Sequence, residues 1–233
     1  MSTFGVALAM TVVGCASADG AVPDEPWSIP SGSSELHAVP ASNLCVTSGK
    51  VDARVDRGMH VDQGGMRGVV AGDASRSVEL AFRYRGPSAE ARALGGGELR
   101  RQIGLKLRAR DSCNLVYVMW HLGDRPGVFV SVKHNAGAST HAECGPNGYL
   151  AVEPRASAPA PEVTPGDSHV LRADLDGLRL RVSADGEVVW TGELPAEALE
   201  ADGPAGVRSD NGAFDFELRT AAPAGAAACR ARD

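Results

Sequence analysis

Short stretches in which large apolar and polar residues alternate recur along most of the chain, separated by glycine-containing turns. In residues 78–84 the large apolar side chains occupy the even positions, and in residues 103–107 they occupy the odd ones. Successive side chains of a β-strand point to opposite faces, so a period of two predicts strands with one buried face. Helical periodicity is nearly absent, and residues 195–200 are the best helix candidate. The pattern predicts an all-β fold packed as a sandwich or a barrel.

Several segments have the composition and alternation expected of strands. They are residues 51–56, 67–71, 77–84, 102–110, 115–121, 128–134, 149–152, 169–174, 178–183, 188–191, 206–209 and 214–219. The length of 233 residues allows one large β domain or two small ones. Because the Pro- and Ala-rich stretch 155–165 is too short for a domain linker, we expect one domain.

The last third of the chain carries a pattern that is specific for a fold. A strand at 169–174 leads to Asp176-Gly177, a second turn follows at Asp185-Gly186, and residues 203–208 read Gly-Pro-Ala-Gly-Val-Arg before a closing strand. This resembles the end of the concanavalin A-like jelly rolls, the superfamily of laminin-G-like lectins, glucanases and alginate-lyase-type enzymes. The resemblance implies an all-β, two-sheet antiparallel jelly-roll sandwich. It does not imply one function, because this fold hosts both lectins and enzymes.

The amino-terminal residues predict export. A short apolar run from Met1 to Gly14 ends at Cys15, which resembles a lipobox, although no Lys or Arg precedes the run as in most signal peptides. The run is too short to span a membrane, which takes about 20 apolar residues. We expect a lipoprotein signal peptide at 1–14, lipidation of Cys15, a flexible tether at 15–35, the jelly roll at 36–229 and a tail at 230–233. A soluble signal peptide with an incidental cysteine, or a buried helix, remains the alternative.

The cysteine count agrees with an exported chain. Apart from Cys15 there are four, an even number that suggests two disulfides. Three pairings are possible. Cys113 precedes one strand of an expected hairpin and Cys144 follows the other, whereas Cys45 and Cys229 lie near the two ends of the domain. We therefore expect the pairs Cys113–Cys144 and Cys45–Cys229.

The charge is unevenly distributed. The formal net charge of −6 excludes a generally basic nucleic-acid binder. Residues 76–133 nevertheless hold eleven Lys and Arg against five Asp and Glu. This basic middle suggests an acidic partner, and the alternative is a scatter of cations over strand edges and loops, where they discourage edge pairing.

The densest group of polar and aromatic residues lies between Cys113 and Cys144. If the valines at 116, 118, 128, 130 and 132 point into the core, Tyr117, His121, Ser131 and Lys133 must point outward. Polar residues of neighbouring strands would join them on what the resemblance implies is the concave face, where saccharides lie. The predicted ligand-binding residues are Arg83, Arg85, Gln102, Lys106, Arg108, Arg110, Tyr117, His121, Ser131 and Lys133. Aromatic rings and arginines suit a sugar with carboxylates.

Catalytic motifs of the superfamily are incomplete. The glucanase pattern Glu-x-Asp-x-x-Glu is absent, which disfavours retaining hydrolysis. Alginate-lyase-type enzymes have Gln-Ile-His where this chain has Gln102-Ile103-Gly104, so His121 would have to supply the base. The histidines show no metal-ligand spacing, and we expect no cofactor. Calcium is the one exception considered, through Asp174, Asp176, Asp185, Asp210 and Asn211, although Asp-Gly and Asn-Gly are also favoured hairpin turns.

The sequence therefore predicts a lipid-anchored envelope lipoprotein, at the outer membrane or the surface, that binds glycan, with acidic polysaccharide as the candidate class. One alternative is a polysaccharide lyase or glycosidase on the same face. Another is a structural or adhesion lipoprotein that binds protein. A carbohydrate and the membrane are the expected partners, and nucleic acid is not. The sequence does not determine the oligomeric state.

Overall fold

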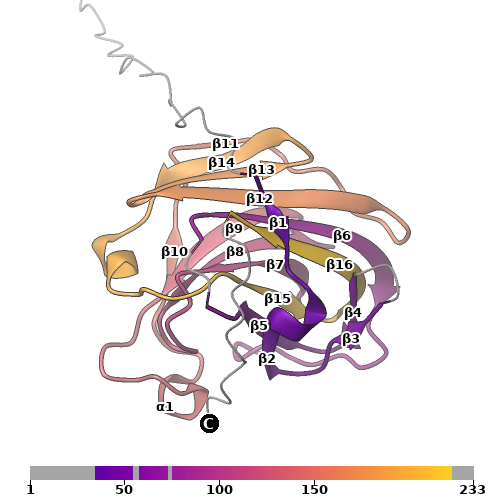
Figure 1. The fold of residues 1–233 in the computed structure, drawn as a ribbon, viewed down its shortest axis with the longest axis horizontal. Coiled ribbons are helices and arrows are strands. Elements are labelled where there is room, and N and C mark those ends of the chain that lie inside the picture. Colours follow the sequence, from indigo (N-terminus) through magenta and orange to yellow (C-terminus); the bar gives the residue numbers. More distant parts are fainter. Residues whose placement is uncertain (1–34, 55–57, 73–74, 222–233) are drawn as a thin grey trace, which may run out of the picture. The chain divides into compact units, whose positions relative to one another are not determined.

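The fold is a sandwich of two antiparallel β-sheets (Figure 1). The computed structural model describes residues 35–54, 58–72 and 75–221. The predicted all-β, two-sheet jelly-roll sandwich is confirmed. No helix among these residues is long and apolar enough to cross a membrane. The predicted signal peptide and Cys15 lie outside the described residues.

Within the described residues, the larger sheet has nine strands. Its order is β11 (Ala156–Ser157), β14 (Glu187–Glu193), β13 (Arg179–Ala184), β12 (Ser168–Asp176), β6 (Ser77–Pro87), β16 (Gly212–Thr220), β4 (Met59–Gln63) and β3 (Asp52–Ala53), and β1 (His37–Ala38) also pairs with β16. The strands β12, β13 and β14 form the orange layer in Figure 1.

The smaller sheet has seven strands in the part of the chain that the structure describes. Its order is β10 (Tyr149–Val152), β9 (Gly127–Lys133), β8 (Leu115–Leu122), β7 (Arg101–Leu107), β15 (Gly206–Asp210), β5 (Met66–Val70) and β2 (Leu44–Ser48). The helical elements are short: the 3-10 turns η1 (Ala41–Asn43) and η2 (Ala196–Leu199), and the α-helix α1 (His141–Cys144).

The core lies between the two sheets and explains the alternation in the sequence. On β8, Val116, Val118 and Trp120 are completely buried against the nine-stranded sheet. The ring of Phe82 on β6 meets Trp120 edge-on, with 5.6 Å between the ring centroids. Because β8 has this apolar face inside, its intervening residues must point away from the core.

Some elements differ from the sequence-based expectation. The expected strand at 51–56 is described only as the two-residue β3, and the strands β2 and β4 were not foreseen because their alternation is short and half polar. The expected helix at 195–200 is the 3-10 turn η2. The expected strand at 102–110 ends at Leu107, because Arg108 adopts a positive φ of 50°.

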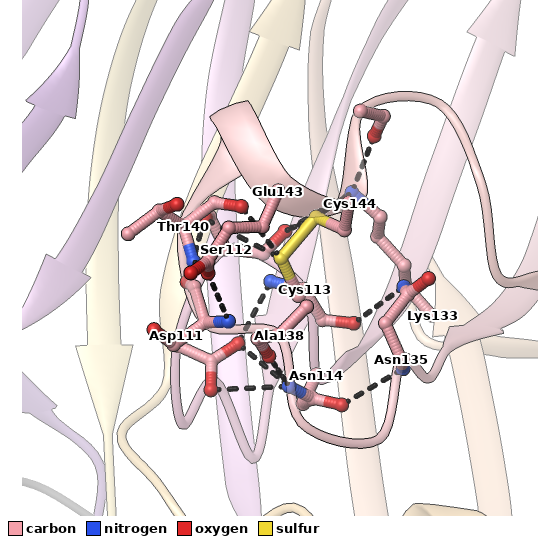
Figure 2. The surroundings of a disulfide bond; sticks show 12 residues. Asp111, Ser112, Cys113, Asn114, Lys133, Asn135, Ala138, Thr140, Glu143 and Cys144 are labelled. Carbon is pink, nitrogen blue, oxygen red and sulfur yellow. Dashed lines mark hydrogen bonds between the residues drawn. A yellow bond between two sulfur atoms is a disulfide. The ribbon is translucent and has the colours of Figure 1, made fainter.

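The predicted disulfide between Cys113 and Cys144 is confirmed, and Figure 2 shows its surroundings. Cys113 is fully buried and Cys144 is nearly so, which protects the bond from solvent. Cys45 is also disulfide-bonded. Its predicted partner, Cys229, lies outside the described residues, so this pairing stays a prediction.

We expect the Cys113–Cys144 bond to carry a large part of the stability of this end of the sandwich. The bond links residues that are 31 positions apart. A crosslink of that span restricts the unfolded chain and contributes about 3 to 4 kcal/mol. The variant Cys113→Ala/Cys144→Ala should lose about that much free energy of unfolding in urea. A loss below ~1 kcal/mol would show that the loop is held by its hydrogen bonds alone.

Candidate functional site

The side of the seven-stranded sheet that faces away from the core is unusually rich in polar and aromatic residues. We call this side the outer face. Register and burial place the following residues on it: Arg67 from β5; Gln102 and Lys106 from β7; Tyr117, Met119 and His121 from β8; Phe129, Ser131 and Lys133 from β9; Tyr149 from β10; and Arg208 and Asp210 from β15. Six of the predicted site residues are therefore brought together on one surface.

Two exposed aromatic rings stand on the outer face, and each has a second ring behind it. Tyr149, 43% exposed, stacks on Tyr117, with 6.0 Å between the centroids and 21° between the planes. Phe129, 45% exposed, stacks on His121 at 4.2 Å and 19°. The backing residues Tyr117 and His121 are four positions apart on β8, which corresponds to roughly 13 Å along the strand. The face thus offers two aromatic platforms at a fixed separation.

The ring of Tyr149 is held in place by cationic neighbours. The Lys133 Nζ lies 5.1 Å from the centroid of the Tyr149 ring. The guanidinium of Arg208 lies 4.9 Å from the centroid of the Tyr117 ring, and its Nη1 is 3.5 Å from the Tyr149 hydroxyl. Cation–π contacts with partly desolvated rings are stabilising, so these cations fix the Tyr149 platform as well as charging the face.

A buried carboxylate organises the centre of the face. Asp210, 1% exposed, accepts hydrogen bonds at Oδ2 from the Arg208 Nε and the Gln102 Nε2, both at 2.7 Å. Its Oδ1 accepts a bond from the Arg67 Nη2 at 3.3 Å. Burial by itself would lower the pKa of Arg208, but the adjacent Asp210 carboxylate raises it above the ordinary value. Arg208 is therefore always charged.

Lys133 has a different role from the one predicted. Its Nζ donates to the Gly145 carbonyl at 2.8 Å and the Ser112 carbonyl at 3.2 Å, and it contacts the Cys144 Sγ at 3.1 Å (Figure 2). The side chain is 1% exposed. Burial lowers the pKa of Lys133 to about 8, and the charges of Arg208 and Arg67 contribute. Lys133 thus ties the disulfide loop to the platform rather than reaching outward.

Burial also shifts the two titratable groups of β8. It raises the pKa of Tyr117 to about 12, partly offset by the positive charge of Arg208. It lowers the pKa of His121 to about 3, with help from Arg100 and Arg208. At neutral pH both rings are therefore uncharged and serve as apolar supports for the platforms.

The predicted placement of Arg83 and Arg85 on this face is wrong. Both belong to β6 in the other sheet, on the side away from the core. The Arg83 Nε donates to the Gly166 carbonyl, and Arg85 pairs with Asp215. Alternation within a strand shows that the arginines oppose the core, but it does not show which of two sheets the strand joins.

The predicted placement of Arg108 and Arg110 also fails, for a local reason. Strand β7 ends before them, and the positive φ of Arg108 changes the parity, so that Ala109 packs with the outer-face cluster instead. The Arg108 Nε donates to the Ala201 carbonyl, and the Arg110 Nη1 donates to the Glu200 carbonyl. These arginines hold the segment after η2.

Sequence reasoning missed the residues that define the centre and the platforms. They are Arg67, Phe129, Tyr149, Arg208 and Asp210. The sequence did contain a signal for two of them. Arg208 and Asp210 alternate with Val207 along one strand, so both must point to the side of the sheet opposite to this valine. What was lacking was the information that β15 lies next to β7.

Lyase-type chemistry of this kind would need Tyr117 as the acid together with His121 as the base, and the geometry does not support both acting on one sugar carbon. Their separation of roughly 13 Å exceeds the reach of proton transfer at a single atom. At Gly104, where the lyase-type motif has its histidine, an added Cβ would lie 2.1 Å from the Val118 carbonyl oxygen and 2.7 Å from the Met119 Cα. The backbone of β8 therefore leaves no room for a side chain at this position.

The residues considered for calcium are distributed among different partners. Asp174 pairs with Arg172, Asp185 with His169, and Asp210 with Arg208. The Asn211 side chain bonds the backbone of residues 92 and 100. Among residues 35–54, 58–72 and 75–221, no group of three or more His, Cys, Asp or Glu is arranged to hold a metal ion.

Comparison with known proteins identifies the fold. No protein-family model and no curated protein sequence matches the chain. Among solved structures, the chain is similar to the carbohydrate-binding module CBM66 from Bacillus subtilis, with a TM-score of 0.52 and 12% identity over 75% of this chain and 92% of that one. It is also similar to domain 4 of AbnA, a GH43 extracellular arabinanase from Geobacillus stearothermophilus, with a TM-score of 0.42 and 10% identity over 75% and 81% of the two chains. The likeness to CBM66 shows a shared β-sandwich fold.

We expect the half-buried His121 to make the free energy of unfolding fall at mildly acidic pH. Its pKa is about 3 in the folded protein, against an ordinary value of 6.5, so the unfolded chain takes up a proton first as the pH falls below 6.5. Stability is lost in that window at up to about 1.4 kcal/mol per pH unit. Unfolding free energies measured from pH 7 to 4 should show this extra slope in the wild type and not in His121→Gln. Equal slopes would mean that the imidazole is protonated in the folded state.

Proposed function

We propose that this protein binds glycan through the outer face of the seven-stranded sheet, with Tyr149 and Phe129 as stacking platforms. The observation that carries the proposal is the pair of exposed rings, each stacked on a ring of β8. Exposed aromatic rings at fixed positions cost free energy in water and are suited to ligand contact. The apolar faces of sugar rings are natural partners for such platforms.

The separation of the platforms suits an extended ligand. The rings lie on the adjacent strands β9 and β10, and their supports are roughly 13 Å apart along β8. A chain of several sugar rings that runs along these strands would contact both. A single monosaccharide would contact only one, so we infer a polysaccharide or oligosaccharide ligand.

The charge of the face favours an acidic glycan. Arg67, Lys106 and Arg208 bring three cations to the outer face, where Asp210 supplies a carboxylate. The positive potential of the outer face would attract an acidic polysaccharide, whereas acidic residues elsewhere on the protein surface would repel it. The likeness in fold to a carbohydrate-binding module supports the proposal without determining the sugar.

We further propose that the chain is an exported lipoprotein anchored through Cys15. The apolar run that ends at this cysteine and the disulfide-bonded cysteines of the sandwich support export. A tether before the domain would leave the outer face accessible to envelope or environmental glycan.

Removal of either platform should weaken glycan binding. Tyr149→Ala and Phe129→Ala should each lower the affinity for a retained polysaccharide about tenfold, because one stacking contact is lost. Leu150→Ala is the matched control: Leu150 is 45% exposed on the same strand as Tyr149 but points to the other side of the sheet. Affinity electrophoresis against a panel of neutral and acidic polysaccharides measures all three.

The same variants, together with assays for product release and for protein capture, separate the alternatives. Equal losses in the platform variants and in Leu150→Ala would contradict the proposed face. Release of products with new ultraviolet absorbance would indicate a lyase. Failure of the wild type to bind any polysaccharide, together with capture of a protein partner, would favour adhesion.

Lipidation predicts a change in partitioning. In a bacterial host that processes lipoproteins, the wild type should enter the detergent phase, because the acyl chains of a lipidated Cys15 prefer an apolar medium. Cys15→Ser should remain in the aqueous phase. A wild type that is found in the aqueous phase would contradict the lipid anchor.

A further inference from the structure

Arg208 lies at the centre of the outer face. One edge of its guanidinium is hydrogen-bonded within the protein, and another edge is open to a further acceptor. The Arg208 Nε is taken by Asp210 at 2.7 Å, and the Nη1 makes only a long contact of 3.5 Å with the Tyr149 hydroxyl. Within the described part of the chain, no residue accepts a hydrogen bond from Nη2. Nη2 is not fully buried either, so it is accessible to solvent. The edge formed by Nη1 and Nη2 can therefore receive an acceptor from outside.

The charges around Arg208 are not balanced. Asp210 is one carboxylate shared by two guanidinium groups, those of Arg208 and Arg67. This group of three carries one net positive charge, and Arg208 is only 7% exposed. A cation that is largely removed from water is costly unless an anion completes its partners. The imbalance therefore favours an anionic group at the free edge.

A second polar atom beside the same carboxylate lacks a partner. Gln102 is 2% exposed, and its Nε2 donates to Asp210. Its Oε1 is fully buried and has no donor in the described part of the chain. Exchanging the oxygen and nitrogen of the Gln102 amide would not give Oε1 a donor, because it would then face the Asp210 carboxylate, which can only accept. The centre of the face thus holds both an unmatched cation and an unmatched acceptor.

We propose that Arg208 is the specificity-determining residue of the glycan site and that it binds the carboxylate of a uronic acid through its free edge. This inference rests on the proposed glycan binding. A planar carboxylate matches two parallel guanidinium donors, whereas a neutral hydroxyl accepts from one of them. The Tyr149 hydroxyl lies against the same Nη1. The sugar ring can therefore stack on Tyr149 while its carboxylate reaches Arg208. Asp210 acts as a positioning residue, because its bond to the Arg208 Nε orients the two outer guanidinium donors toward this carboxylate.

The first test needs no variant. The probes are oligomers of polygalacturonate, polyguluronate and polyglucuronate, each paired with the neutral glycan made by reducing its carboxyl groups. Titration calorimetry should show at least one acidic member bound about tenfold or more tightly than its reduced counterpart. Equal binding of both members of every pair would overturn the carboxylate inference and leave glycan binding intact. No binding to any of the six, with none in the wider panel, would instead overturn the proposed function.

The second test separates the contribution of the two parallel guanidinium donors from that of the positive charge. Arg208→Lys keeps the positive charge but loses the two parallel donors. It should weaken binding of the preferred polyuronate about tenfold and leave the slope of affinity against salt concentration unchanged. Arg208→Met should weaken binding and also reduce that slope. Neither variant should alter binding of the reduced glycan by more than about twofold.

Arg85→Lys is the matched control, because Arg85 is paired with an aspartate on the other sheet. It should bind every probe as the wild type does. Near-ultraviolet circular dichroism establishes that each variant is folded before titration. An Arg208→Lys variant that is folded and binds the polyuronate as tightly as Arg85→Lys would overturn the role of Arg208.

Discussion

Val116, Val118 and Trp120 are completely buried between the two sheets, and this packing determines where the other residues of β8 must lie. A shift of one position would place Tyr117 and His121 in the core and move three apolar side chains into water. The neighbouring strands β7 and β9 have the same orientation of their two faces, because Ile103 and Leu105 on β7 are also buried in that core. So are Val130 and Val132 on β9. The arrangement of the outer face is therefore a consequence of core packing.

The outer face differs from an ordinary solvated surface because much of it is also buried. Tyr117, Gln102, Arg208 and Asp210 are all less than a tenth exposed, although none of them points into the core. Charged groups in such a place must be paired, and the bonds from Arg208, Arg67 and Gln102 to Asp210 provide the pairing. A network of this kind allows few arrangements, so it presents its remaining donors in one geometry.

The disulfide loop belongs to the same construction. Lys133 leaves β9 on the outer side and reaches the carbonyls of Ser112 and Gly145 next to the Cys113–Cys144 bond (Figure 2). The loop returns into β10, whose first residue is Tyr149. One buried cation thus connects the covalent link to the exposed platform. This explains why a lysine on the outer face serves the loop and not the solvent.

The sequence by itself determined the fold class, the inward valines and the Cys113–Cys144 pair, because each depends on local alternation or on the two ends of one hairpin. It could not determine which sheet a strand joins. Arg83 and Arg85 were therefore assigned to the wrong sheet, Arg208 was left out of the predicted site, and Asp210 was considered only as a calcium ligand. Only the tertiary structure placed β15 between β7 and β5 and changed the parity at Arg108. The physical reason is that hydrogen bonding between strands distant in the chain leaves no mark on the alternation within either strand.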